Sequence, residues 1–242
     1  MTYGDYKGYK SINFEVGDRN SIIILPENPL PGNPWIWRAE FLGAFDSVDM
    51  ELVRRGWHLA YHQVSNMYGC PESLEMMKEF YDVAVKNYNL NRRPVIFGFS
   101  RGGLYTVNFA NKYPGCVSAL YLDAPVTDIK SWPGGKGVGR GAEYEWKECL
   151  GWYKLDEESA KTFKGNPNDY AENIAKYGIP VIIVAGDSDK VVPYVENGAI
   201  FYDTFSKYSD KIQTIVKPGC DHHPHSLEDP TPVVNFIEKY AL

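Results

Sequence analysis

The sequence predicts an α/β fold, in which a mostly parallel, twisted sheet carries helices on both of its faces. Two observations lead to this prediction. The apolar runs at 94–97 and 180–185 are unbroken, which is typical of strands that are buried on both faces. Strand-like and helix-like segments also alternate along the chain, an order that implies parallel strands joined by right-handed crossovers. The length of 242 residues suits one such domain, which we expect to span residues 1–242.

The first half of the chain begins with a β-hairpin. Its strands lie at 11–16 and 21–25, and the residues between them, Gly17-Asp18-Arg19-Asn20, favour a turn. A long loop with several prolines and glycines follows at 26–37. The elements expected after this loop are a helix at 44–55, a strand at 56–62 and a helix at 72–88.

The second half contains one long interruption. The elements expected there are a strand at 94–99, a helix at 104–112, a strand at 117–122, and strands at 180–185 and 211–216. More than fifty residues separate Asp123 from Pro180, although one helix is enough to connect two neighbouring parallel strands. We therefore expect a cap or lid inserted at about residues 126–178. Its glycine run follows no apolar strand and lacks a G-K-[ST] ending, so it predicts a mobile flap rather than a phosphate-binding loop.

Ser100 is the expected nucleophile. It lies in Gly98-Phe99-Ser100-Arg101-Gly102, where a buried strand turns sharply into a helix. Such a turn projects the hydroxyl above the sheet, and the two glycines let the flanking backbone pass without Cβ clashes. A serine hydroxyl is a weak nucleophile until a neighbouring base takes its proton. The pattern therefore requires a histidine within reach of Ser100.

Three aspartates are candidates for the acid that would orient this histidine. Asp187 and Asp189 follow the strand at 180–185, and Asp123 ends the strand before it. Asp187 is nearest to the strand end and suits a cap of the turn. Asp123 ends a strand at a place that some hydrolases use for the acid, but it can equally bond to backbone amides of its own loop.

Three histidines are candidates for the base. His222, His223 and His225 all follow the strand at 211–216. Side chains of adjacent residues in an extended loop point in opposite directions, so only one of His222 and His223 can face Ser100. His225 lies further along, where we expect it to orient the loop or to line the pocket. Serine, aspartate and histidine then follow one another in a different order from the chymotrypsin and subtilisin triads.

The segments G-F-S-R-G, G-D-S-D-K-V-V-P and G-C-D-H resemble the three active-site motifs of the α/β-hydrolase superfamily, in its esterase and prolyl-oligopeptidase-like branch. The resemblance extends from the strand at Ser21 to the end of the chain. It implies the α/β-hydrolase fold, with Ser100 as nucleophile, Asp189 as acid and His222 as base. It also implies chemistry that needs neither a metal nor a cofactor.

Two loops are expected to supply the backbone donors of the oxyanion hole. Arg101, the residue after the nucleophile, is expected to supply one backbone N–H. The second donor is expected from the loop that follows the hairpin, but the H-G pair common in esterases is missing there, and we expect Asn28 or a residue near Trp37 instead. Trp35 and Arg38 are expected to contact the substrate. The alternatives are that the tryptophans pack beneath the loop and that Arg38 is a structural charge.

These residues predict a serine carboxylesterase that forms an acyl-enzyme. A small-molecule or carbohydrate ester is the expected substrate, and by analogy it carries an acetyl or hydroxycinnamoyl group. One alternative is a serine peptidase or amidase of the prolyl-oligopeptidase type, although the additional gating domain usual in that group does not fit into this length. The other is a non-catalytic binding protein, but such proteins commonly lose a triad residue.

Composition excludes several other classes. The net charge is −6 without a run of lysine or arginine, which argues against binding to nucleic acid or to an anionic membrane surface. No apolar stretch reaches a membrane-spanning length and no signal sequence opens the chain, so we expect a cytoplasmic protein, with a removed leader as the alternative. The four cysteines lack metal-ligand spacing. Free thiols are expected, and a Cys70–Cys220 disulfide is the alternative.

Overall fold

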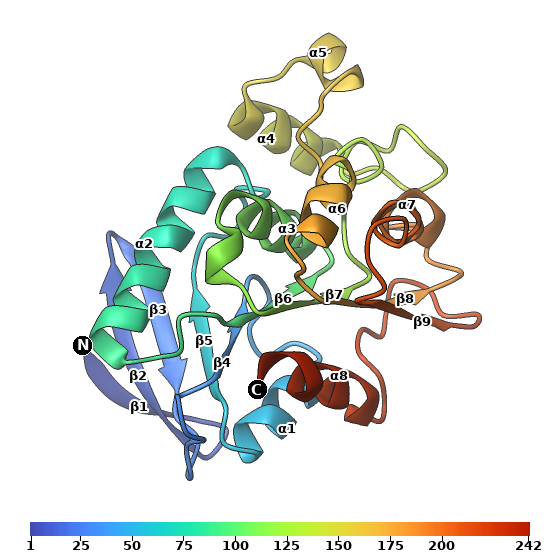
Figure 1. The fold of residues 1–242 in the computed structure, drawn as a ribbon. Helices are drawn as coiled ribbons and strands as arrows, with labels where there is room; N and C mark the ends of the chain where they lie inside the picture. The colour runs from blue at the N-terminus through green and yellow to red at the C-terminus, as the bar shows by residue number, and fades with distance from the viewer.

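One nine-stranded sheet forms the centre of the molecule in the computed structural model, which describes residues 1–242 (Figure 1). The strands are β1 (Thr2–Tyr6), β2 (Tyr9–Val16), β3 (Arg19–Ile24), β4 (Trp35–Arg38), β5 (His58–His62), β6 (Val95–Phe99), β7 (Ala119–Asp123), β8 (Val181–Gly186) and β9 (Ile212–Lys217). Their order is β1-β2-β3-β5-β4-β6-β7-β8-β9. Pairing is antiparallel from β1 to β5 and parallel from β5 to β9, so the predicted mostly parallel sheet is present.

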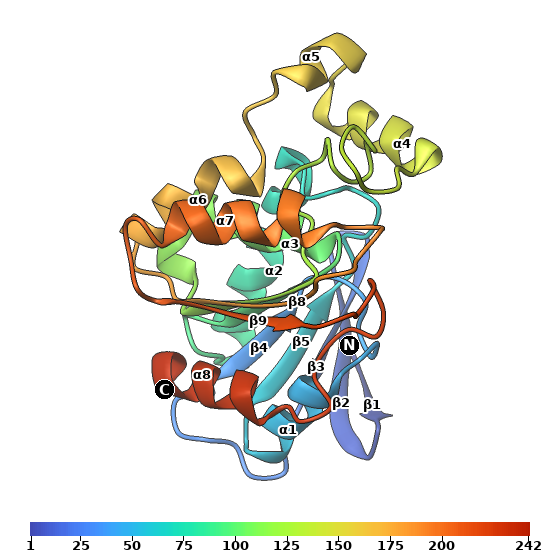
Figure 2. The ribbon, with the colours of Figure 1, turned by 90° about the vertical axis from the view of Figure 1, so that its right-hand side faces the viewer.

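Helices cover both faces of this sheet. They are α1 (Ser47–Arg54), α2 (Pro71–Tyr88), α3 (Gly102–Lys112), α4 (Glu143–Tyr153), α5 (Glu157–Lys161), α6 (Pro167–Lys176), α7 (Gly198–Phe205) and α8 (Thr231–Ala241), with 3₁₀ turns at Pro114–Cys116 and Tyr194–Glu196. Helices α1 and α8 lie on one face, and α2, α3, α6 and α7 lie on the other (Figure 2). Only α2 reaches 18 residues, and no helix is apolar enough at that length to cross a membrane.

The strands divide their side chains between two apolar cores. In β8, Val181 and Ile183 join the core under α2, α3, α6 and α7, whereas Ile182 and Val184 join the core under α1 and α8. This alternation is the reason why a central strand is apolar at every position. All six residues of β8 and all five of β6 are buried.

Two strands were not predicted. Strand β1 lies at the edge of the sheet and is almost entirely exposed, so it lacks an apolar pattern. Strand β4 has only four residues, and it follows a loop rich in proline that hides its start. All four are buried, and β4 pairs with both β5 and β6 in the middle of the sheet. The loop at 39–46 therefore leaves the sheet beside the end of β6, where Ser100 follows.

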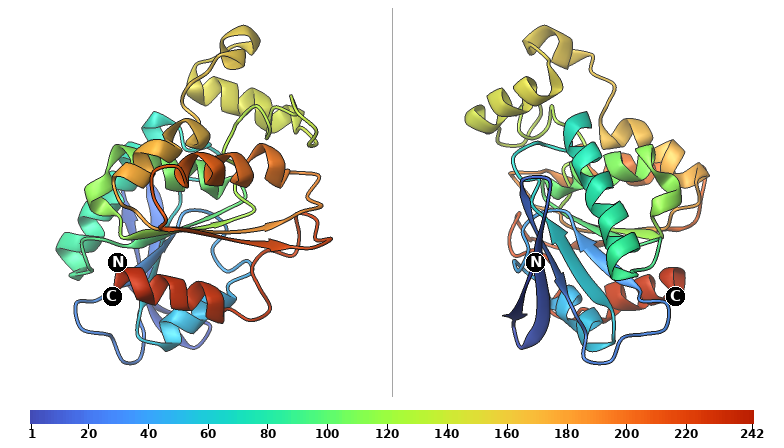
Figure 3. Two further views of the ribbon diagram at one scale, coloured as in Figure 1. Left: turned by 45° about the vertical axis from the view of Figure 1, so that its right-hand side comes forward. Right: turned by 90° about the vertical axis from the view of Figure 1, so that its left-hand side faces the viewer.

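The structure refines the insertion expected at 126–178. Its last helix, α6, packs beside α3 and α7, and Ala171 and Ile174 belong to the core on that face. Helices α4 and α5 instead stand clear of the sheet (Figure 3). The two ends of this projecting cap meet, because the Ile129 N–H donates to Asn166 Oδ1 at 3.0 Å and the Asn168 N–H donates to the Thr127 carbonyl at 3.0 Å.

Hydrogen bonds between the body and the cap hold the cap in place. The Tyr68 hydroxyl donates to Glu148 of α4 at 2.9 Å, and the Tyr153 hydroxyl donates to the Tyr68 carbonyl at 2.8 Å. A small apolar cluster that includes Leu104 of α3 and Trp146 of α4 lies between the two parts. The cap is therefore packed against the body near the first turn of α3.

His62 gives the fold a specific sensitivity to acid. Its ring is buried against Phe80 at a centroid distance of 5.0 Å, and its Nδ1 hydrogen-bonds with Ser21 Oγ at 2.9 Å. Burial lowers the pKa of His62 from 6.5 to about 4, with a smaller contribution from the positive charge of Arg19. The native state therefore stays unprotonated between pH 6.5 and 4, whereas the unfolded chain takes up a proton.

We expect this difference to remove about 2 kcal/mol of unfolding free energy between pH 7 and pH 5. Glutamine at position 62 cannot be protonated, so in His62→Gln the loss between the same two pH values should be smaller by about that amount. Urea denaturation of both proteins at pH 7 and pH 5 measures the difference. An equal loss in the two proteins would show that His62 does not carry this dependence.

Candidate active site

Ser100 occupies a sharp turn between β6 and α3. Its φ of 50° is in the left-handed region, where a side chain other than glycine is strained. A Cβ on Gly98 would lie 2.6 Å from Thr106 Oγ1, and a Cβ on Gly103 would lie 2.7 Å from the Val126 carbonyl oxygen, so neither site has room for a side chain. The Ser100 N–H donates to the Asp123 carbonyl at 2.8 Å, which fixes the turn to the end of β7.

The structure brings Ser100, His222 and Asp189 together. Ser100 Oγ is 3.0 Å from His222 Nε2, and His222 Nδ1 is 2.7 Å from Asp189 Oδ2. Both partners of the serine are nearly inaccessible to solvent, at 8% and 7% exposure. An ionised Asp189 accepts from the Nδ1–H of His222, so the lone pair on Nε2 is free to take the serine proton.

Backbone groups fix the orientation of Asp189. Its Oδ1 accepts from the N–H groups of Val191 and Val192, each at 2.8 Å, and only Oδ2 faces the histidine. Asp187 is exposed and accepts from the Gly219 N–H at 2.7 Å, so it caps a turn and does not reach His222.

Asp221 joins the two loops that carry the acid and the histidine. Its Oδ1 accepts from the Lys190 N–H at 2.9 Å and from the His222 N–H at 2.8 Å. These two backbone donors lower the pKa of Asp221 below its ordinary value. The sequence shows only an aspartate next to the histidines, so this bridging role could not be inferred from it.

The other two histidines do not contact Ser100. His225 is buried, and its Nδ1 is 2.7 Å from Asp123 Oδ1, which makes a second aspartate–histidine pair. Asp123 Oδ2 also accepts from the Tyr121 hydroxyl at 2.7 Å and from the Ser226 N–H at 2.9 Å. Asp123 is therefore committed to this pair and lies apart from His222.

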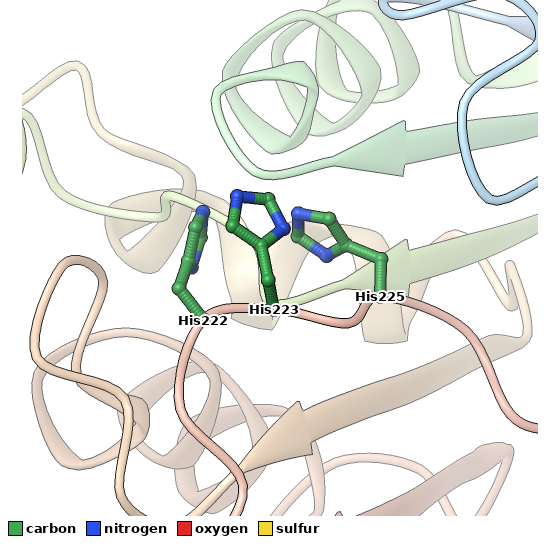
Figure 4. A group of neighbouring side chains, drawn as sticks. All are labelled: His222, His223 and His225. Carbon is green, nitrogen blue, oxygen red and sulfur yellow. The ribbon is translucent and has the colours of Figure 1, made fainter.

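His223 is exposed and makes no side-chain hydrogen bond. Its ring centre lies 4.9 Å from that of His222 and 4.8 Å from that of His225, so the three rings form a triangle (Figure 4). Partial burial lowers the pKa of His223, and the charges that His225 and His222 carry when protonated lower it further.

Two backbone N–H groups near Ser100 have no acceptor within the protein. One belongs to Arg101, the predicted donor, and the other to Glu40 in the loop after β4. The Glu40 nitrogen lies 3.9 Å from the position of a Cβ on Gly102, which places this loop against the first turn of α3. Together they can supply the two donors that an oxyanion requires.

A buried ion pair joins the two residues that carry these N–H groups. Arg101 Nη2 is 3.0 Å from Glu40 Oε2, and the Glu40 side chain is 1% exposed. Burial raises the pKa of Glu40, and the guanidinium of Arg101 offsets part of this effect. The pair holds the loop after β4 against the turn at Ser100. Glu40 could not be found from the sequence, because β4, which places it, was not predicted.

The structure contradicts the expectations for Trp37, Trp35 and Arg38. Trp37 lies inside β4 between two neighbouring strands, so its N–H is directed at a strand and not at the active site. The Trp35 and Trp37 rings are buried in the core and stack at 5.7 Å. The Arg38 side chain is fully buried, with its guanidinium 3.2 Å from Asp49 and 3.6 Å from the Phe99 ring centre. These three expectations are therefore wrong, because each side chain belongs to the interior.

The glycine-rich segment of the cap is fastened beside the acid loop. The carboxylate of Glu196 accepts from the Ser131 hydroxyl at 2.7 Å and from the Val138 N–H. The Arg140 N–H donates to the Lys190 carbonyl at 2.8 Å. The sequence predicted a free flap here, but these bonds hold the segment one residue away from Asp189. All four cysteines are free, so the alternative of a Cys70–Cys220 disulfide does not hold.

Comparisons with known proteins agree with this geometry. The chain matches the model of the prolyl oligopeptidase family over residues 57–241. No curated protein sequence matches it significantly. An esterase from Pyrococcus furiosus superposes with a TM-score of 0.69 at 15% identity, covering 100% of this chain and 98% of that chain. An acylaminoacyl peptidase from Pyrococcus horikoshii gives a TM-score of 0.73 at 16% identity, covering 100% of this chain and 42% of that chain.

A puromycin-hydrolysing peptidase from Mycobacterium tuberculosis gives a TM-score of 0.66 at 16% identity, covering 91% of this chain and 36% of that chain. At such low identity the structures establish the fold, and they confirm the one predicted from the sequence. The family match, in turn, covers more than half of the chain. The chain therefore belongs to the prolyl oligopeptidase family, and it is a serine hydrolase with the α/β-hydrolase fold.

Proposed function

We propose that the protein is a serine carboxylesterase. The observation that carries the proposal is the hydrogen-bonded chain from Ser100 through His222 to Asp189, at 3.0 Å and 2.7 Å, beside two unpaired backbone N–H groups. A nucleophile, an oriented base and donors for a developing negative charge are the parts that acyl transfer needs.

The mechanism follows from these positions. His222 Nε2 takes the proton of Ser100 as its Oγ attacks the ester carbonyl, and Asp189 stabilises the imidazolium that forms. The N–H groups of Arg101 and Glu40 hold the charge on the tetrahedral oxygen. His222 then protonates the leaving alcohol. A water molecule then attacks the acyl-enzyme while His222 takes its proton. His222 returns a proton to Ser100 as the carboxylic acid product leaves.

Two observations support an ester over a peptide substrate. The three buried carboxylates near the site are paired, since Glu40 pairs with Arg101, Asp189 with His222 and Asp123 with His225. None of these three is free to recognise the ammonium group of a peptide N-terminus. The likeness to the Pyrococcus furiosus esterase also covers 98% of that chain, whereas the likeness to the acylaminoacyl peptidase covers 42% of that one.

Amide hydrolysis is the second candidate, and membership of the prolyl oligopeptidase family favours it. A comparison of kcat/KM for an ester and for an anilide distinguishes an esterase from a peptidase. We expect kcat/KM for p-nitrophenyl acetate to exceed that for an aminoacyl p-nitroanilide by a factor on the order of 10² or more, because the buried carboxylates of the site are already paired and cannot bind the ammonium group. Comparable or faster release of p-nitroaniline would identify a peptidase. The Ser100→Ala protein serves as the blank for hydrolysis that does not use the site.

Within the esters, a carbohydrate ester is the substrate class that we propose. Its support no longer includes Trp35 and Trp37, which are buried. The remaining support is the half-buried Trp132 and the more exposed Trp152 on the cap, because flat apolar rings suit the faces of sugars. Faster deacetylation of a peracetylated sugar than of a simple alkyl acetate would favour it, and equal rates would remove it.

A further inference from the structure

We propose that His222, His223 and His225 form a binding site for a divalent transition metal of the Zn²⁺ class, and that the bound ion switches the hydrolase off. The three side chains come from one short loop after β9 and gather at one place (Figure 4). Their ring centres are 4.8–4.9 Å apart in all three pairs, and one nitrogen from each ring lies within 4.8 Å of the others.

The spacing is close to that of a three-histidine site. Tetrahedral zinc with Zn–N bonds of about 2.0–2.1 Å places its ligand nitrogens about 3.3 Å apart. The largest of the present separations exceeds this by roughly 1.5 Å, so the rings must move closer together to complete the site. His223 is free to do so, because its side chain is exposed and makes no hydrogen bond. The same exposure gives the ion a path to the site from solvent.

Two of the three rings are already oriented by carboxylates. Asp189 binds the Nδ1 side of His222 at 2.7 Å, and Asp123 binds the Nδ1 side of His225 at 2.7 Å. A carboxylate on one ring nitrogen fixes the tautomer and turns the other nitrogen, with its lone pair, towards a metal. In His222 that second nitrogen meets Ser100, whereas in His225 it has no partner within the protein. The hydrolytic mechanism makes no use of the His225–Asp123 pair, and a metal site gives it a role.

The charges of the site suit a dication. The side chains of Asp189 and Asp123 are each 1% exposed, and their two negative charges balance the two positive charges of the ion. Neutral imidazoles complete the shell without adding charge, and a water molecule takes the fourth position.

Binding and catalysis compete for one lone pair. The Nε2 of His222 that accepts from Ser100 Oγ at 3.0 Å is the atom that the metal would bind. While the ion is bound, Ser100 has no base, so hydrolysis stops until the ion dissociates. This inhibitory part of the proposal rests on the proposed function, but the binding part does not.

Binding is tested on the Ser100→Ala protein, since alanine there removes no metal ligand. Titration with ZnCl₂ in a calorimeter should give one site per chain, and Co²⁺ should give the visible absorption of a tetrahedral complex. Adding His223→Ala should weaken Zn²⁺ binding by about 10-fold or more, because one of three protein ligands is lost. Cys220→Ser is the matched control and should leave binding unchanged, since its thiol contacts only backbone carbonyls of this loop.

Inhibition is tested on the otherwise unaltered enzyme. Zn²⁺ should abolish p-nitrophenyl acetate hydrolysis, and EDTA should restore it. His223→Ala should keep the basal rate and should raise the half-inhibitory Zn²⁺ concentration by the same factor as the calorimetric change. Absence of calorimetric binding, or equal binding in His223→Ala, overturns the site. Binding without inhibition overturns the switch. If the protein hydrolyses no ester, the proposed function fails, and calorimetry alone decides the metal site.

Discussion

Replacement of Ser100 by alanine should lower kcat for ester hydrolysis by a factor on the order of 10⁶. The hydroxyl that the substitution removes is the nucleophile, and its partner, His222 Nε2, lies 3.0 Å away. Alanine keeps the Cβ and the turn at φ 50°, and the Ser100 N–H can still donate to the Asp123 carbonyl. The fold should therefore be unchanged. Stopped assays with p-nitrophenyl acetate, together with thermal unfolding of both proteins, measure the two effects.

Ser188→Ala is the matched control for this experiment. Ser188 is an exposed serine in the loop that also carries Asp189, and its hydroxyl contacts only Asp187 at 2.9 Å. Its loss should leave turnover close to that of the parent protein. A well-folded Ser100→Ala protein with more than about one per cent of the parent activity would be incompatible with a serine nucleophile at this position.

Asp189→Asn should lower kcat by a factor on the order of 10⁴. The reason lies in the hydrogen bonds of the carboxylate. Its Oδ1 accepts from the N–H groups of Val191 and Val192, so an asparagine would keep its oxygen there and turn its NH₂ group towards His222. The NH₂ group donates, and the histidine must then accept at Nδ1 and carry its proton on Nε2. In that tautomer it cannot take the proton of Ser100.

The comparison with two other aspartates makes this test specific. Asp187→Asn keeps an oxygen that can accept from the Gly219 N–H, so turnover should change little. Asp123→Asn disturbs a buried pair with His225, and its main effect should be on stability. If Asp123→Asn lost more turnover than Asp189→Asn at equal stability, the acid would have to be assigned to β7.

The sequence was most informative where burial is complete. Strands β6 and β8 are apolar at nearly every position because both of their faces are covered. Strand β1 gave no signal, since an edge strand with exposed side chains has no apolar alternation. Helix α6 was assigned to the cap because nothing in its sequence separates it from α4 and α5. The core contacts of Ala171 and Ile174 are tertiary information.

The residues of the candidate site also fall into two groups, those that a local motif predicts and those that only the fold brings together. The resemblance of the three motifs to those of the α/β-hydrolase superfamily was enough to name Ser100, Asp189 and His222, which the structure brings within hydrogen-bonding distance. Glu40 and Asp221 could not be found in this way. Their roles depend on which loops meet in space, and a carboxylate that bridges two loops has no local pattern. Trp35 and Trp37 were wrongly expected at the active site. They lie in a segment whose prolines favour a loop, although the structure places them in a buried strand.

The meeting of residues 127–129 with residues 166–168 has a consequence for how such a protein changes over evolutionary time. A segment that departs and returns at a single point can be lengthened, shortened or exchanged without altering the register of any strand. The entropy of closing a loop rises only with the logarithm of its length, so even large insertions there cost little stability. New substrate ranges can therefore arise in this architecture through gain and loss of whole segments, while the catalytic framework is inherited intact.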